Sequence, residues 1–382
     1  MKRLDHIEIV GAGPAGLYVA ILLKQSFTSA SVTIRERNPE NAEIGFGVVF
    51  SDQALDFLQA DDPATHGLIT PLMERWQDIT VSLEGERVTL DGIGFAAVAR
   101  RTLLDCLRRR AREVGVELHY ESPVLDVPSL SRNADLIIGA DGVNSVVRES
   151  ASSVFQPDIE QCRNHFAWFG ADIEFDTLTQ TFLSTDHGAL NAHHYRYAPG
   201  KSTFIVECEP RSFDLLAFAD RDEHDSAKIC SELFADPLNG TQLQTHQSFW
   251  RQFPKLTCAK WTTDNRVLIG DAAHTAHFSI GSGTRLALED AIALVRAVEQ
   301  SDTIDSALGE YERARRPIVE KIVAGSIASA AWYDRFTSEM AYPPLEFAKR
   351  YLTRSARLDN ERLRKVSPKF ASTYEEWAGS HP

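Results

Sequence analysis

A glycine-rich turn near the N-terminus has the residue types and spacing needed to hold a diphosphate. Gly11, Gly13 and Gly16 form a GxGxxG pattern between apolar runs at 6–10 and 17–25, which predict a strand and a helix. The first glycine permits a tight turn, the second lets a pyrophosphate approach the backbone, and the third lets helix and strand pack closely. Pro14 and Ala15 lie at the helix start, where exposed amides favour phosphate. The pattern predicts a dinucleotide site, against the alternative of a glycine turn without a ligand.

An acidic residue ends the next predicted strand. The run SVTIRE at 31–36 is rich in β-branched residues and completes a strand–helix–strand unit, so the first two strands should be parallel. Glu36 is placed to accept hydrogen bonds from a ribose diol; the alternative is a solvated strand end. We assign Glu36 and the adjacent Arg37 to the candidate cofactor site.

A second motif follows a later apolar strand, VLIG at 267–270. Its Gly270 and Asp271 are followed by a glycine-containing run that begins a helix expected at 286–299, and this run consists of Gly281, Ser282, Gly283 and Thr284. Glycines allow backbone amides to come close to a ligand, and a helix N-terminus stabilises negative charge there. The alternative role for Asp271 is that of a helix N-cap.

The other predicted elements fall into two groups. A helix at 102–114, a strand near Leu118 and a strand at 136–139 continue the alternation of strands and helices. After about Phe155, strand-like runs follow one another and predict an antiparallel sheet with a turn at 198–201. From about Ile304 the chain is expected to be helical. The strand-like runs lie at 166–173, 181–184, 189–197 and 202–208.

Three fingerprints in this order resemble those of the FAD-dependent aromatic hydroxylases, the group A flavoprotein monooxygenases with the hydroxybenzoate-hydroxylase fold. They are the GxGxxG turn, Asp141 with Gly142, and Gly270 with Asp271. The resemblance implies that Asp271 binds the ribityl chain of the flavin, and that the segment of Asp141 contributes to FAD and NAD(P)H binding. It also implies that Arg101 opens a helix near the FAD phosphates; Arg100 could take that role instead, and either could be a surface residue.

The resemblance implies an α/β fold: a Rossmann-like FAD-binding domain of the glutathione-reductase type, an antiparallel substrate-binding sheet and a helical C-terminal region. We expect the FAD-binding domain to be built from residues 1–75, 97–155 and 262–300. A hairpin at 76–96 and a domain at 156–261 should form the substrate sheet, and 301–382 the helical region.

A narrower branch, which hydroxylates aromatic CoA thioesters and an indole-type metabolite, resembles this chain at 44–52, 202–208, 277–284 and 352–357. Those relatives often carry a second, reductase domain, which we do not expect here because the sequence ends at Pro382. Many broader relatives have proline where Phe278 stands. We assign seven residues to the substrate side: Gly47, Val49, Trp168, His193, Tyr195, His277 and Phe278. The alternative for Trp168 and Tyr195 is sheet core, and the alternative for His193 is a structural histidine.

The implied reaction is hydroxylation of an electron-rich aromatic ring with NAD(P)H and O2 through a flavin hydroperoxide. An aryl-CoA thioester is the favoured substrate, and a free aromatic or indole-type metabolite is the alternative. A non-catalytic FAD-binding protein is the alternative from another class. A flavin halogenase is disfavoured because no Trp-x-Trp-x-Ile-Pro signature is present. The sequence identifies no catalytic base.

The composition restricts the classes of binding partner and the cellular compartment that can be expected. A net charge of −14 argues against a non-specific nucleic-acid binder. The five cysteines lack metal-ligand spacing and predict free thiols in a reducing compartment, and we expect no metal site. The polar N-terminus and the absence of an apolar run of about 20 residues predict a cytoplasmic protein without a membrane span. We expect a monomer or homodimer. The basic stretch 349–369 predicts a solvated helix face or a rim for CoA phosphates.

Overall fold

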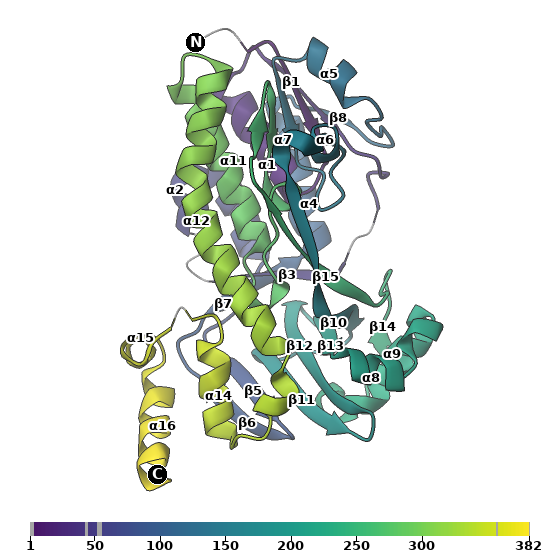
Figure 1. The fold of residues 1–382 in the computed structure, drawn as a ribbon, viewed down its shortest axis with the longest axis vertical. Coiled ribbons are helices and arrows are strands. Elements are labelled where there is room, and N and C mark those ends of the chain that lie inside the picture. The colour runs from purple at the N-terminus through teal and green to yellow at the C-terminus, as the bar shows by residue number, and fades with distance from the viewer. Residues whose placement is uncertain (1–3, 43–44, 52–55, 357, 382) are drawn as a thin grey trace.

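The protein is seen here in a computed structural model that describes residues 4–42, 45–51, 56–356 and 358–381. Within these ranges the strands form three sheets. Figure 1 shows the two larger sheets one above the other, with the long helix α12 (Ile304–Tyr333) running beside both of them. The two ends of the chain lie at opposite ends of the molecule.

The first sheet carries the dinucleotide motifs and has six strands in the order β16-β17-β9-β1-β2-β8. All neighbouring pairs are parallel except β16–β17, and the predicted parallel pairing of the first two strands is confirmed. Strands from three separated parts of the sequence therefore meet in one layer. They are β1 (His6–Val10), β2 (Ser31–Arg35), β8 (Glu117–His119), β9 (Leu136–Gly139), β16 (Thr262–Thr263) and β17 (Arg266–Leu268).

Three helices pack beside this sheet: α1 (Pro14–Ser26), α4 (Arg100–Val114) and α11 (Gly283–Gln300). Each begins two or three residues before the predicted start, because the first turn of a helix needs no apolar residue. Helix α1 has proline in its first turn, where the missing N–H costs nothing. Helix α4 ends at Gly115, whose φ of 87° is left-handed.

The second sheet has eight strands and carries most of the substrate candidates. Its main path runs β14-β10-β13-β12-β11-β5-β6, and β15 also pairs with β10. All of these pairs are antiparallel except β5–β11, which is parallel. The strands are β5 (Ile79–Leu83), β6 (Glu86–Leu90), β10 (Pro157–Ala171), β11 (Leu178–Thr185), β12 (Gly188–Ala198), β13 (Lys201–Cys208), β14 (Leu243–Gln244) and β15 (Arg251–Cys258).

A small third sheet joins the two larger ones. It contains β3 (Gly47–Ser51), β7 (Phe95–Ala99) and β4 (Glu74–Trp76), all antiparallel. The Gly47 N–H donates to Thr203 Oγ1 at 2.9 Å, and Tyr195 Oη donates to the Gly47 carbonyl at 3.0 Å. These bonds tie β3 to the middle of the eight-stranded sheet. The domain boundaries given above remain predictions.

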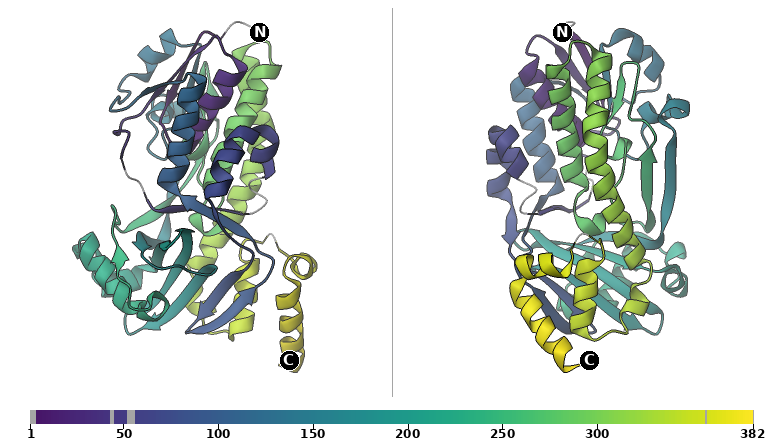
Figure 2. Two further views of the ribbon diagram at one scale, coloured as in Figure 1. Left: turned by 180° about the vertical axis from the view of Figure 1, so that it is seen from behind. Right: turned by 60° about the vertical axis from the view of Figure 1, so that its left-hand side comes forward.

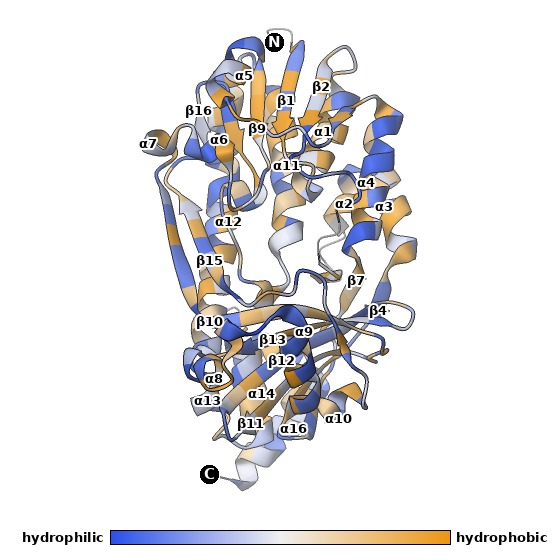
Figure 3. Ribbon diagram, turned by 90° about the vertical axis from the view of Figure 1, so that its right-hand side faces the viewer, coloured by the Kyte–Doolittle hydropathy of each residue, from blue (hydrophilic) through white to orange (hydrophobic). Residues whose placement is uncertain are grey.

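The remaining helices lie around the two large sheets, and Figure 2 shows α16 projecting at the C-terminal end. Colouring by hydropathy shows apolar strands inside the six-stranded layer and polar helix surfaces outside it (Figure 3). No helix among the described residues is long and apolar enough to cross a membrane. The helices are α2 (Asp56–Asp61), α3 (Pro63–Ile69), α5 (Val127–Asn133), α6 (Val146–Glu149), α7 (Ser152–Phe155), α8 (Pro210–Leu215), α9 (Glu223–Leu233), α10 (Ala235–Leu238), α13 (Phe336–Glu339), α14 (Pro344–Thr353), α15 (Asn360–Val366) and α16 (Pro368–Ser380).

Candidate active site

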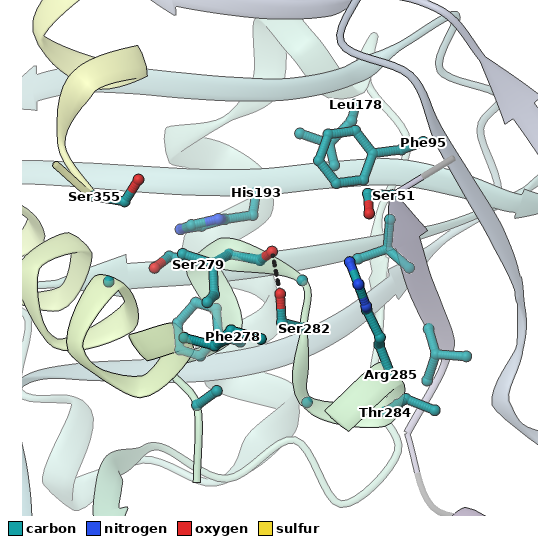
Figure 4. Close-up of a pocket in the computed structure, with 18 of the residues that line it drawn as sticks. Ser51, Phe95, Leu178, His193, Phe278, Ser279, Ser282, Thr284, Arg285 and Ser355 are labelled. Atoms are coloured by element: carbon teal, nitrogen blue, oxygen red, sulfur yellow. Dashed lines mark hydrogen bonds between the residues drawn. The ribbon is translucent and has the colours of Figure 1, made fainter. Parts of the chain in front are cut away.

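A cavity of about 1590 Å³ lies where the three sheets meet. It runs from the glycine turn at the start of α1, past the loop before α11, to the face of the eight-stranded sheet and the connection between α14 and α15. A single drug-sized ligand fills roughly 300–1,000 Å³, so this cavity has room for a dinucleotide and a second molecule. Figure 4 shows His193 and Leu178 on the sheet side, and Phe278 and Ser282 on the loop before α11.

The glycine turn has the geometry that its spacing predicts. Gly11 has a φ of 102°, and a Cβ there would stand 2.5 Å from the Ala140 carbonyl oxygen. A Cβ on Gly16 would overlap the Gly11 carbonyl oxygen, whereas one on Gly13 would meet nothing within 4 Å. The outer two glycines are therefore required by packing. Gly13 faces the cavity together with Pro14 and Ala15.

Two adjacent arginines at the start of α4 lie in different surroundings. Arg100 lines the cavity, and its Nε is buried without a hydrogen-bond partner in the described part of the chain. Burial lowers the pKa of Arg100, and the Asp271 carboxylate partly counteracts that shift. Arg101 is 62% exposed and lies 3.9 Å from Asp105, away from the cavity lining. The structure thus favours Arg100, the alternative noted from the sequence, for contact with a phosphate.

The loop before α11 places Asp271 and four further predicted residues on the cavity. Asp271 lies in a short 3-10 turn, and the N-cap of α11 is Ser282, so Asp271 does not cap that helix. Asp271 is exposed to the cavity, but desolvation by the surrounding protein raises its pKa, while His274 and Arg100 oppose the rise. The run at 281–284 lines the cavity, and Gly281 has a φ of 60°.

A buried carboxylate that our reading of the sequence did not single out for a role holds this loop in place. Asp290 on α11 is 0% exposed and accepts hydrogen bonds from the Gly270 N–H at 3.0 Å, His274 Nε2 at 2.8 Å and Arg315 Nε at 2.7 Å. Burial alone would raise the pKa of Asp290, but His274 and Arg315 outweigh it and lower that pKa. An acid on an otherwise apolar helix face was the signal for such a role.

Three further cofactor candidates do not line the cavity, and two of them, Glu36 and Asp141, hold loops in place. Glu36 accepts the Ala12 N–H at 2.8 Å and bonds to Asn38 through its other oxygen, so it joins the glycine turn to the end of β2. Asp141 accepts the Val146 N–H at 2.7 Å, and burial raises the pKa of Asp141. Arg37 is exposed after β2.

The substrate candidates separate into two groups. Val49, Trp168, His193, Tyr195 and Phe278 line the cavity. The other two do not: the Gly47 backbone packs against Tyr197, and His277 faces a small pocket behind the loop. The Tyr195 hydroxyl donates its hydrogen bond to the Gly47 carbonyl.

The basic stretch 349–369 is largely engaged within the protein. Arg350 pairs with Glu339, Arg364 with Glu375, and Lys365 with Glu361. Arg354 donates from Nε to Ser329 Oγ and from a terminal nitrogen to the Ser279 carbonyl, so it links the loop before α11 to α12. Arg362 is exposed and lines the cavity, and Arg357 lies outside the described residues.

These residues fit FAD. The open approach at Gly13, the unpartnered Arg100 Nε and the accessible Asp271 all lie on the wall of the cavity. A dinucleotide supplies a diphosphate for the first two and sugar hydroxyls for the third. When bound, FAD supplies the oxygen-activating chemistry. Among the described residues, no group of three histidine, cysteine or acidic side chains could hold a metal ion.

Known structures share this architecture. A structure of 2-methyl-3-hydroxypyridine-5-carboxylic acid oxygenase superposes with a TM-score of 0.71 at 19% identity, over 95% of this chain and 96% of that one. P. aeruginosa PqsL, in complex with 2-aminobenzoylacetate, superposes with a TM-score of 0.68 at 19% identity, over 88% and 98% of the two chains. The fold is that of FAD-binding aromatic hydroxylases.

Sequence comparison defines the family. Residues 4–326 match the FAD binding domain family. Salicyloyl-CoA 5-hydroxylase of Streptomyces sp is 38% identical over 91% of this chain and 69% of its own length. The 3-hydroxy-4-methyl-anthranilyl-[aryl-carrier protein] 5-monooxygenase of Streptosporangium sibiricum is 35% identical, over 86% and 89%. Protodeoxyviolaceinate monooxygenase of Chromobacterium violaceum is 29% identical, over 90% and 93%.

The chain therefore belongs to the FAD binding domain family and is an FAD-dependent monooxygenase of the aromatic-hydroxylase class. NAD(P)H is the usual reductant of such enzymes. The prediction of this class and of its cofactors from the three fingerprints is confirmed. The three relatives described above are by name a hydroxylase and two monooxygenases, which sets aside the alternative of a non-catalytic FAD-binding protein.

Proposed function

We propose that this monooxygenase hydroxylates an electron-rich aromatic ring carried on a thioester, with an aryl-CoA as substrate. The observation that carries the proposal is the charge of the cavity wall. Its lining contains a single carboxylate, Asp271, among the described residues. Against it stand five cations, of which one, Arg285, is paired with Glu289 at 2.7 Å. The five are Arg100, Arg285, Lys321, Arg354 and Arg362. In a chain with a net charge of −14, this local excess favours a ligand with several phosphates.

The positions of these cations support a second anionic ligand besides FAD. Arg100 lies at the glycine-turn end, where the FAD diphosphate would bind. Arg354 and Arg362 line the cavity near the connection between α14 and α15, next to the loop at 92–94. An aryl ring at His193 with a long thioester arm toward Arg362 would use this part of the cavity.

The relatives support the same substrate class. Two of them act, by name, on an aromatic acyl group bound to CoA or to an aryl-carrier protein. A third acts on protodeoxyviolaceinate, which keeps a free aromatic or indole-type metabolite as the alternative.

The proposal is tested by comparing the turnover of two aryl-CoA esters with that of their free acids. The panel holds salicyloyl-CoA, 2-aminobenzoyl-CoA and the two free acids, each incubated with air, FAD and NADH or NADPH, with products identified by mass spectrometry. We expect hydroxylated CoA esters and little product from the free acids. Equal activity on a free acid and its CoA ester would contradict the thioester proposal and favour the alternative.

Charge reversal tests the phosphate contact. Arg362 is chosen for the variant because its side chain is exposed and lines the cavity, whereas Arg354 links the loop before α11 to α12. Arg362→Glu should raise the KM for an aryl-CoA about two- to five-fold at low salt. It should leave kcat nearly unchanged, because the nucleotide lies far from the reacting ring. The effect should shrink as salt screens the charges.

Lys369→Glu is the matched control, since Lys369 is an exposed cation of the same stretch that does not line the cavity. An equal effect of the two variants on KM would show a general effect of charge and not a phosphate contact.

A cytoplasmic location and a monomeric or homodimeric state remain proposals. All five cysteines are free and buried, which supports a reducing compartment. Localisation of a tagged full-length chain and light scattering of the purified protein test the two points.

A further inference from the structure

A buried polar network lies at the cavity wall on the eight-stranded sheet, and none of its members is among the residues assigned to FAD. Gln180 on β11 pairs in register with His193 on β12, which pairs with Ile205 on β13. Glu207 lies two residues further along β13 and therefore projects from the same face. Gln180 and His193 line the cavity, and Glu207 lies behind them.

The hydrogen bonds of this network form one chain. Tyr333 Oη donates to Gln180 Oε1 at 3.0 Å, and Gln180 Nε2 lies 3.0 Å from His193 Nδ1. His193 Nε2 lies 3.3 Å from Glu207 Oε2, and Asn164 Nδ2 donates to Glu207 Oε1 at 3.0 Å. With the Gln180 amide as donor, His193 is neutral and carries its proton on Nε2, facing Glu207.

The side chains of His193 and Glu207 are both almost fully excluded from solvent. His193 is 4% exposed and Glu207 is 2% exposed. Burial lowers the pKa of His193 to about 3, and Arg354 adds to that shift. Burial raises the pKa of Glu207, while His277 and Arg354 oppose the rise. A buried carboxylate lowers stability unless it is well paired, so its place beside the cavity points to a function.

We propose that His193, backed by Glu207, is the acid–base residue of the hydroxylation. A ring hydroxyl of the substrate takes the place of the Gln180 amide and donates to His193 Nδ1. Its O–H bond breaks and an N–H bond forms on Nδ1, while the Nε2 proton passes to Glu207 Oε2, so that His193 stays neutral and the negative charge moves from Glu207 to the ring oxygen. The ring oxygen becomes electron-rich before oxygen is inserted. Afterwards Nδ1 returns its proton to the product and Glu207 returns its proton to Nε2, so protons balance over the cycle.

This inference rests on the monooxygenase class and not on the thioester. The charged and titratable groups that face His193 come from three other elements: Glu207 from β13, Tyr333 from α12, and Arg354 from the end of α14. His277, on the loop before α11, also acts on Glu207. Any pH profile must therefore be compared with a control that retains all of them.

The neighbouring His194 provides that control. It is 2% exposed, as buried as His193, but it points to the other face of the sheet. There it bonds to Thr181 Oγ1 at 2.9 Å and stacks on Phe204 with ring centroids 5.0 Å apart. His194→Asn thus removes a buried imidazole from the same strand without touching the cavity.

The first test measures coupling in the holoenzyme with salicyloyl-CoA and with salicylate. His193→Asn should lower product formation at saturation by about 10²- to 10⁴-fold. NAD(P)H oxidation should continue, so that product per NAD(P)H falls. Glu207→Gln keeps a polar partner for His193 and Asn164, and should therefore lower product formation less than His193→Asn does. In His193→Asn the rate should recover as pH rises and the substrate hydroxyl ionises by itself. Full coupling in His193→Asn, or an equal loss in His194→Asn, would overturn the proposal.

The second test does not depend on the identity of the substrate. The oxidised holoenzyme is titrated with 4-nitrophenol, whose phenol and phenolate absorb differently. Wild type and His194→Asn should lower the apparent pKa of the bound probe relative to free solution, and His193→Asn should not. If wild type leaves the ionisation of the probe unchanged, His193 is not the base. If the probe shifts but neither salicyl compound is hydroxylated, the substrate assignment fails and the acid–base assignment stands.

Discussion

The glycine-turn end of the cavity and its sheet end hold polar groups in different ways. At the glycine-turn end, the position of the backbone decides the geometry. Gly11 and Gly16 leave no room for a Cβ, and Asp290 holds the loop through the Gly270 N–H. At the second, side chains from four strands form the polar surface. The difference teaches that changes at the first end should damage folding and FAD binding together. Changes at the second end should alter the reaction and leave the fold intact.

The largest effect is expected from Asp290→Ala. Arg315, only 5% exposed, would keep Glu289 at 2.8 Å but lose Asp290. The Gly270 N–H and His274 would lose their acceptor as well. Together these losses should lower the free energy of unfolding by about 3–5 kcal/mol. The lowered pKa of Asp290 means that its contribution is present above the unfolded-state pKa and is lost as pH falls through the folded-state pKa. Chemical unfolding of the apo-protein at several pH values measures this, and Glu207→Gln serves as the comparison. Equal losses in the two variants would remove the contrast between the two ends.

Two glycine variants distinguish a glycine needed for packing of the fold from a glycine needed for the approach of FAD. Gly16→Ala should destabilise the apo-protein by about 1–3 kcal/mol, because the new Cβ meets the Gly11 carbonyl oxygen. Gly13→Ala should leave apo stability nearly unchanged and weaken FAD binding, because its Cβ points into open space that the diphosphate needs. Thermal unfolding with and without FAD distinguishes the two. Normal FAD affinity in Gly13→Ala would place the diphosphate elsewhere.

Asp271→Ala should weaken FAD binding about ten- to hundred-fold, equivalent to roughly 1.5–3 kcal/mol for a hydrogen bond to a charged group. Apo stability should change little, because Asp271 caps no helix. Fluorescence titration of FAD gives the affinity. Asp302→Ala, at an exposed acid in the connection between α11 and α12, is the control. A parallel loss of apo stability would assign Asp271 a structural role.

The smallest effect is expected from the pH dependence of Glu207→Gln. The folded-state pKa of Glu207 is raised. The wild-type protein is therefore most stable, as far as this group is concerned, below the unfolded-state pKa of glutamate. It loses stability as the pH rises from that value toward the folded-state pKa. The variant lacks this titration, so its stability relative to wild type should increase between acid and neutral pH. Thermal unfolding across that range tests the sign. A constant difference would mean that Glu207 titrates normally in the fold.

The sequence alone determined the dinucleotide end of the site. GxGxxG, Asp141 and Asp271 act through turn geometry and helix starts that depend on neighbouring residues, so spacing predicted the strands, the helices and the FAD class. The strands of the second sheet were also predicted in large part. Strand β15 was not, because it contains Pro254 and pairs with β10 across a long separation in sequence.

Tertiary structure decided the rest. Whether Arg100 or Arg101 faces the cavity depends on how α4 is rotated against the cavity wall. Asp290 and Arg315 meet because α11 and α12 pack together. Glu207 reaches His193 only through the register of β12 and β13. Such pairings arise between residues distant in sequence, and they depend on packing and register, which local spacing does not encode.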